Sequence, residues 1–177
     1  RERLLEVVAK VLEVDYPEIE DVSQETIRKT KRMLMVLSES CPQTPNMSKL
    51  YAELETDRVQ GLKMLSALDR AGLLALAPAK GTSLKNLSKP EKIYCDNTNL
   101  MYALVPRVDA GVWRETYFYN QLRKDHTVTC SDAGDFVVDG KYTFEVGGKG
   151  KTFRQIKDMP NSFVVNDGVE MGFGNKI

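Results

Sequence analysis

Apolar residues in the first half of the chain recur at the three- and four-residue spacing of amphipathic helices. This pattern predicts helices over residues 4–14, 26–38, 49–54 and 58–71. Pro17 is expected to stop the first helix, because proline lacks the N–H that a helix interior needs. Ser23 and Asp57 stand where the N-caps of the second and fourth helices belong, and Gly72 stands where a C-terminal cap belongs.

The order of these helices predicts a winged helix. A short helix, a tight turn and a longer helix after a leading helix make a helix-turn-helix. Asn46 or Ser48 would cap the short helix. Two short apolar runs, 73–76 and 92–95, would then pair as the strands of the wing. Residues 1–95 are therefore predicted to form a helical, winged-helix domain.

The longer helix of this motif carries basic and amide side chains, which are the groups that contact DNA in a winged helix. Its predicted buried stripe is Val59, Leu62, Leu65 and Leu68. The candidate nucleic-acid-binding residues, on this helix and in the wing loop, are Arg58, Gln60, Lys63, Lys80 and Lys85. The formal net charge is zero, so the chain lacks an overall basic surface, which weakens DNA binding without excluding it. Packing against a neighbouring domain is an equal alternative.

Short runs of β-branched and aromatic residues alternate with helical segments in the second half. The predicted helices cover residues 100–105, 112–123 and 152–157, and the predicted strands cover 127–129, 136–138, 142–144 and 163–165. In the helix over 112–123 the expected inward residues are Trp113, Tyr117, Phe118 and Leu122. This order predicts an α/β domain over residues 96–177, truncated at its C-terminal end, and so an α+β fold for the whole chain.

The stretch 134–146 predicts a β-hairpin with one carboxylate at the end of each strand. Asp139-Gly140 is a tight-turn dipeptide, because glycine accepts the positive φ that such turns need. Pairing around it would place Asp135 and Glu145 opposite or diagonal to each other, where they could share a Mg²⁺ ion. A metal-dependent nuclease needs such a pair. The alternative is a plain hairpin with solvated acidic ends.

The amino-acid composition limits the class of protein and the kinds of site that the chain can form. The 177 residues are 42% hydrophobic and 28% charged, which suits one large globular domain or two small ones. Cys41, Cys95 and Cys130 form no CxxC pair and His126 is the only histidine, so neither a zinc site nor a disulfide framework is expected. This cysteine usage is typical of a reducing cytoplasm. No apolar run approaches the ~20 residues that span a bilayer, so no membrane partner is expected.

Several segments of the chain resemble a family of prokaryotic AAA-type ATPases. The resemblance is carried by residues 31–35, 44–50, 92–94, 97–104, 114–122, 134–136 and 144–149, and so covers most of the chain. In that family a P-loop ATPase domain is followed by a winged helix and a domain of unknown function similar to PD-(D/E)xK nucleases. No GxxxxGK[ST] motif occurs here, so this chain is predicted to be the C-terminal part without an ATP site.

The resemblance implies a restriction-endonuclease-like domain. At one position, residue 147, the chain lacks the residue type that this class of nuclease has. Such nucleases often place a further acid where this chain has Glu115 and a polar helper where it has Gln155. They place a lysine two residues after the glutamate, where this chain has Gly147. Lys149 is the candidate charge stabiliser in its place. Lys149 and Lys151 both lie further along the chain and reach the site only if the Gly-Gly pair forms a bulge.

The missing lysine decides between two functions. The first is a non-catalytic recognition region that couples the N-terminal ATPase domain of a longer chain to a DNA or protein partner. The second is a Mg²⁺-dependent DNA nuclease with Asp135 and Glu145 as metal ligands and Lys149 as the stabilising charge. Because Gly147 leaves the positive group poorly placed, the sequence favours the first function and predicts little or no DNA cleavage.

Overall fold

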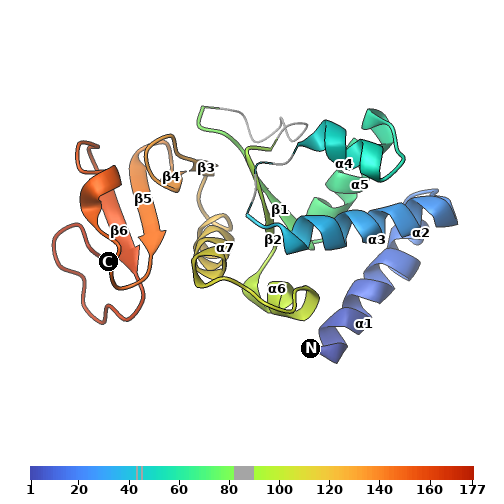
Figure 1. Cartoon of the computed structure of the whole chain (residues 1–177), viewed down its shortest axis with the longest axis horizontal. Coiled ribbons are helices and arrows are strands. Elements are labelled where there is room, and N and C mark those ends of the chain that lie inside the picture. Colours follow the sequence, from blue (N-terminus) through green and yellow to red (C-terminus); the bar gives the residue numbers. More distant parts are fainter. Residues whose placement is uncertain (43, 45, 82–89) are drawn as a thin grey trace.

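The chain folds into a helical half and a sheet-bearing half that meet at a ribbon of two strands (Figure 1). The structure is a computed structural model and describes residues 1–42, 44, 46–81 and 90–177. Helices α1 to α5 surround one face of the ribbon, β3 contacts β1 on the other side, and β5 and β6 lie at the far end of the molecule beyond α7. The fold class is therefore α+β, as predicted. The winged-helix and restriction-endonuclease-like assignments stay predictions.

The helical half follows the predicted order closely. Its elements are α1 (Glu2–Lys10), a π turn η1 (Val11–Asp15), α2 (Tyr16–Ile19), α3 (Gln24–Glu39), α4 (Met47–Glu53) and α5 (Arg58–Arg70). The side chains of Ser23, Asn46 and Asp57 each accept a backbone N–H three residues on, so these N-caps are confirmed. Gly72 has a φ of 66°, as a C-terminal cap requires.

The prediction that Pro17 stops the first helix is wrong. The helical path continues through η1 and ends at Ile19. Pro17 lies in the first turn of α2, directly after η1.

The predicted buried stripe of α5 is also partly wrong. Val59 is 67% exposed and Leu62 is half-buried, whereas Leu65 and Leu68 are buried. A spacing of three residues turns by about 300° on an α-helix, so the three steps from Val59 to Leu68 add up to a half turn beyond two full turns. Val59 and Leu68 consequently face opposite sides. The buried stripe instead comprises Gly61, Met64, Leu65 and Leu68.

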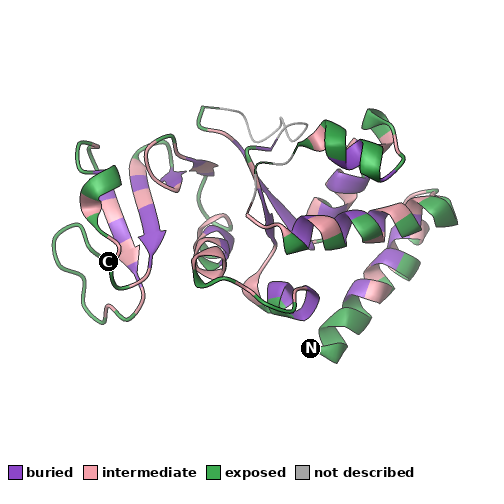
Figure 2. Cartoon of the chain, viewed as in Figure 1, coloured by how far each residue is buried: buried purple, intermediate pink, exposed green. Residues whose placement is uncertain are grey.

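The ribbon consists of β1 (Leu74–Ala77) and β2 (Lys92–Cys95), paired antiparallel as predicted for the wing. Side chains alternate between the faces of a strand, and both faces of this ribbon are buried (Figure 2). Leu74, Leu76 and Ile93 belong to the core of the helical half, and Ala75 and Tyr94 belong to the core of the sheet-bearing half. The predicted domain boundary at residue 95 thus lies at an element that serves both cores.

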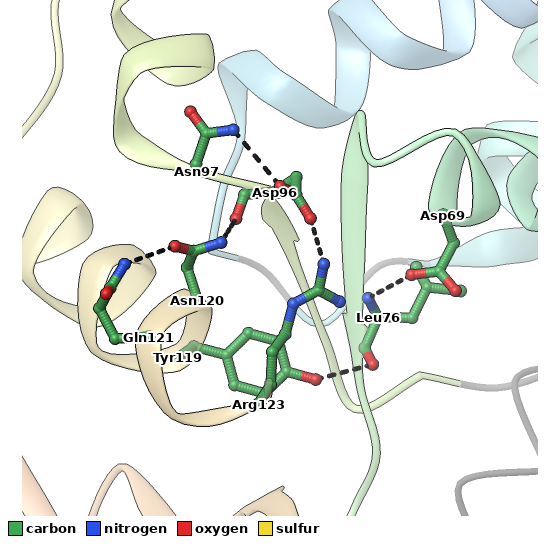
Figure 3. Close-up of polar contacts among 8 residues, drawn as sticks. All are labelled: Asp69, Leu76, Asp96, Asn97, Tyr119, Asn120, Gln121 and Arg123. Atoms are coloured by element: carbon green, nitrogen blue, oxygen red, sulfur yellow. Dashed lines mark hydrogen bonds and ion pairs between the residues drawn. The ribbon is translucent and has the colours of Figure 1, made fainter. Parts of the chain in front are cut away.

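Helices α6 (Thr98–Leu104) and α7 (Ala110–Leu122) connect the ribbon to the second half. A polar network fixes α7 to the ribbon (Figure 3). Tyr119 Oη donates to Leu76 O at 3.0 Å, Asn120 Nδ2 donates to Asp96 O at 2.8 Å, and the Arg123 guanidinium pairs with the Asp96 carboxylate. Tyr119, and not the predicted Tyr117, is the buried tyrosine of α7.

The second sheet has the order β3 (Val128–Cys130), β4 (Phe136–Val138), β5 (Tyr142–Gly147) and β6 (Ser162–Asn166). Neighbours from β3 to β5 are antiparallel, and β6 runs parallel to β5. The predicted hairpin between β4 and β5 is confirmed. Asp139 and Gly140 have φ values of 52° and 65°, and Lys141 N donates to Val138 O at 3.1 Å.

The segment between β5 and β6 departs from the prediction. Of the helix expected over 152–157 only a 3-10 turn, η2 (Phe153–Gln155), is formed.

In the described ranges of the chain no helix has both the length and the apolar character needed to cross a membrane.

We expect Gly61→Ala to lower the free energy of unfolding by about 1–2 kcal/mol, although alanine favours helices more than glycine does. A Cβ on Gly61 would overlap the ring of Tyr51, which is 7% exposed and belongs to the core. Urea unfolding measures the change. Gly150→Ala is the control, because a Cβ there meets nothing within 4 Å. A Gly61→Ala protein more stable than wild type would show that the Tyr51 ring shifts freely.

Candidate functional site

The hairpin brings Asp135 against the strand that carries Glu145. Phe136 pairs with Phe144 at the end of the ladder, so Asp135 and Glu145 each stand one residue beyond the last pair. Asp135 N donates to Phe144 O at 2.9 Å, and Asp135 Oδ2 accepts the N–H of Val146 at 2.7 Å. The backbone of Asp135 is therefore bonded to the residue before Glu145, and its carboxylate is bonded to the residue after Glu145.

Glu145 is a charged side chain in an interior position, only 1% exposed. Its Oε1 forms an ion pair with Lys151 Nζ, and its Oε2 is buried without a hydrogen-bond partner among the described residues. Burial raises the pKa of Glu145, the hydrogen bond from Lys151 opposes that rise, and the charges of Asp135 and Glu115 add to it. A buried carboxylate oxygen without a donor is unfavourable unless a cation or donor meets it.

Lys151 reaches Glu145 through the space that a side chain at position 147 would fill. A Cβ built on Gly147 would lie 2.7 Å from Cγ and Cδ of Lys151. A turn in which Lys151 N donates to Gly148 O at 2.8 Å brings the chain back over β5. Burial lowers the pKa of Lys151, but the hydrogen bond to Glu145 and the nearby carboxylates outweigh it and raise the pKa overall. The lysine is thus held in its charged form.

Lys149, the predicted stabilising charge, points elsewhere. It is exposed, and its Cε would lie 3.2 Å from a Cβ built on Gly168. Its charge contributes to lowering the pKa of Asp167, after the larger effect of Arg114. Gln155, the predicted polar helper, lies on η2 with an exposed side chain. The structure therefore brings Lys151, rather than Lys149, to Glu145.

Glu115 approaches the same carboxylates from α7. Its Oε2 accepts hydrogen bonds from Lys92 Nζ at 3.2 Å and from Tyr94 Oη at 3.1 Å. Burial and the Glu115 charge both raise the pKa of Tyr94, so its phenol stays protonated and donates. The charge of Glu115 also acts on Glu145 and on Lys151. Both partners of Glu115 come from β2, so the ribbon orients this acid.

Sequence reasoning missed Lys92 and Tyr94. Their spacing of two residues places them on one face of β2. This spacing could have indicated from the sequence that the strand presents two hydrogen-bond donors on the same side. Nothing local indicated that Glu115, 21 and 23 residues further on, would receive both.

The predicted nucleic-acid-binding residues are distributed as follows. Arg58, Lys63 and Lys80 are exposed. Gln60 is half-buried, and its Nε2 donates to Thr26 Oγ1 at 3.4 Å. Lys85 lies outside the described residues. DNA binding by this surface stays a prediction.

In the part of the chain that the structure describes, no group of three or more histidine, cysteine, aspartate or glutamate side chains is placed to hold a metal ion. Asp135 and Glu145 provide a pair of carboxylates. Mg²⁺ often takes one or two carboxylates and fills its other positions with water and phosphate oxygens. The unpartnered Oε2 of Glu145 fits a cation by charge and by chemistry.

Comparison with known proteins gives no relative to guide the interpretation. No protein-family description matches the chain, and neither a curated protein nor a solved structure is significantly similar to it. The resemblance to AAA-type ATPases stays a prediction, and the function must be argued from the site itself.

Proposed function

We propose that Asp135, Glu145 and Lys151 form the site of a metal-dependent nuclease of the PD-(D/E)xK type. The observation that carries the proposal is the Lys151 side chain, which lies over Gly147 and pairs with Glu145. A lysine directly at position 147 is what the family pattern would supply. Here a lysine four residues later fills the same space, so the main objection to catalysis is removed.

Each residue has a distinct part in this proposal. The Asp135 carboxylate and Oε2 of Glu145 would hold Mg²⁺, which supplies an activated water and neutralises developing charge when bound. The Lys151 ammonium stabilises negative charge on the phosphate that is attacked. Glu115 serves as an accessory acid whose orientation is set by Lys92 and Tyr94.

A second proposal concerns the helical half, which we propose to be a docking region for an ATPase domain of the same longer chain. Exposed apolar residues on its first helical segment support this, since Val7 is 51% exposed and Ile19 is 72% exposed. A groove of about 310 Å³ lies between this segment and α5, bordered by Ile19, Ala67 and Arg70. Docking and cleavage are compatible, because the two regions occupy different halves of the molecule.

The nuclease proposal predicts that the protein nicks plasmid DNA or cuts single-stranded DNA with Mg²⁺ or Mn²⁺, and that a chelator stops the reaction. Asp135→Asn should lower the rate at least about tenfold, because the amide keeps the hydrogen bond from Val146 but loses the charge that binds a cation. Gel assays measure both effects.

The matched control is Asp158→Asn, since the Asp158 side chain is 88% exposed. This variant should cut like wild type. Absence of cleavage by the wild-type protein with either metal, or equal cleavage by Asp135→Asn, would overturn the proposal.

A further inference from the structure

Two of the three cysteines, Cys41 and Cys95, lie together in the helical half. Cys95 is the last residue of β2, and side chains alternate along a strand, so Cys95 lies on the same face as Ile93. Ile93 belongs to the core of the helical half, together with Leu34 and Leu37 of α3. Cys95 therefore points towards α3, which contacts β2 in the fold (Figure 1).

Cys41 reaches the same place from the end of α3. It follows the last residues of that helix, and its backbone N donates to Ser38 O at 3.5 Å. Its Sγ donates to Leu37 O at 3.0 Å, so the Cys41 side chain is held against the end of the helix. There the thiols of Cys41 and Cys95 share a hydrogen bond. Both cysteines are free thiols in this structure.

The surroundings of this pair differ from those of the third cysteine. Cys41 is partly exposed, whereas Cys95 is buried. The hydrogen bond from Cys41 lowers the pKa of Cys95, while the same hydrogen bond and burial raise the pKa of Cys41. The pair therefore loses one proton readily and the second with difficulty. Burial raises the pKa of Cys130, in the core of the sheet-bearing half, to about 12.

We propose that Cys41 and Cys95 form a reversible disulfide when the protein meets a peroxide. Once the pair has released one proton, Cys41 attacks a peroxide oxygen with the remaining proton on Cys95. An S–O bond forms, the O–O bond breaks, and the departing hydroxide takes up the released proton to become water. Cys95 then attacks the Cys41 sulfur, so that an S–S bond forms, the S–O bond breaks, and a second water leaves with the Cys95 proton. The two thiols lose two electrons, and one peroxide is reduced to two waters.

The disulfide would tie the end of α3 to the ribbon. It closes a loop over residues 41–95 that contains α4, α5 and β1. Closing a long loop restricts the unfolded chain more than closing a short one, so the bond favours the folded state. Cys95 directly precedes Asp96, whose contacts with Asn120 and Arg123 fix α7. Formation of the bond is independent of the proposed nuclease function.

Peptide mapping tests the bond directly. The full chain is treated with hydrogen peroxide, its remaining thiols are alkylated, and it is digested with trypsin without reduction. The expected product is a linked pair of peptides, residues 33–49 and 93–107, each with one cysteine, which dithiothreitol separates. Peptides that stay unlinked, or a link that involves Cys130, would overturn the inference.

Thermal melting measures the effect of the bond on the fold. The oxidised protein should melt roughly 5–15 °C higher before treatment with dithiothreitol than after it. Both melts use the same oxidised sample, so methionine oxidation contributes equally to each. Cys41→Ser should show no such shift. Cys130→Ala is the control, because it removes a thiol outside the pair and should keep the whole shift. An oxidised wild-type protein that melts no higher than the reduced protein, or an equal shift in Cys41→Ser, would contradict the inference.

Discussion

Replacing Lys151 by methionine should lower the rate of metal-dependent DNA cleavage about 10²- to 10³-fold, the usual effect of removing one preorganised group that stabilises charge in the transition state. Methionine keeps an unbranched apolar stem, so it can still lie over Gly147. The affinity for DNA should change little, because one charge near the phosphate contributes mainly when the reaction occurs. Single-turnover cleavage with saturating enzyme separates the two effects.

Lys149→Met is the matched control, since it removes an equal charge two residues away from an exposed position. It should cleave within about twofold of wild type. A larger loss in Lys149→Met than in Lys151→Met would contradict the assignment of Lys151.

If Lys151 stabilises charge in the reaction, Gly147→Ala should also lower the rate of DNA cleavage, although this substitution removes no functional group. The added Cβ would lie 2.7 Å from the stem of Lys151 and displace the ammonium from Glu145. Combining Gly147→Lys with Lys151→Gly moves the lysine to the residue that projects into the same space, and it also removes the Lys151 Cβ, which would lie 2.8 Å from the new Cβ. If the double variant cleaves DNA faster than Lys151→Met does, the location of the ammonium group in the site determines the rate. The residue number that supplies the lysine is then unimportant.

Glu145→Gln should lower the rate of cleavage about 10³-fold, because it removes both a metal ligand and the ion-pair partner of Lys151. It should also abolish the stabilisation of the fold by Mg²⁺. Wild-type protein should gain about 1.4 kcal/mol of stability at a Mg²⁺ concentration ten times the Kd. The glutamine variant should gain none. Thermal melts with and without Mg²⁺ measure the difference, and Glu170→Gln, at an exposed position, should behave like wild type.

In a chelator the same variant should be more stable than wild type at neutral pH. The pKa of Glu145 is raised in the folded state, chiefly by burial, so ionising it costs more there than in the unfolded chain. This penalty is absent below the ordinary glutamate value of about 4.3, grows as the pH rises from there to the raised folded-state value, and is constant above it. The difference in Tm should therefore shrink as the pH falls towards 4. A glutamine variant that melts below wild type at pH 7 would contradict this.

Local patterns allowed much of the fold to be predicted, because caps and turns depend on neighbouring residues. Ser23, Asp57 and the Asp139-Gly140 turn were identified from the sequence, and each is formed as predicted. The turn then sets the register that brings Asp135 to the strand that carries Glu145, where its carboxylate accepts the N–H of Val146. The prediction was wrong for Val59, which is exposed. A spacing of exactly three residues does not stay on one face of a helix, so Val59 was wrongly assigned to the buried stripe.

The candidate site could be predicted only in part, because its remaining members depend on contacts distant in sequence or on unfilled space. Lys151 reaches Glu145 because Gly147 lacks a side chain and the intervening turn folds back, and neither condition follows from a motif. Glu115 is oriented by two residues of a strand in the other half of the chain.

The ribbon of β1 and β2 has a consequence for how the molecule melts. One face of it completes the core of the helical half and the other completes the core that holds Tyr94. Loss of either core would expose apolar surface belonging to the other, so we expect a single cooperative unfolding transition with one calorimetric peak. A polypeptide ending at residue 95 would leave Tyr94 uncovered, and one starting at residue 96 would lack the two donors of Glu115. The halves differ in architecture and yet behave as one thermodynamic unit.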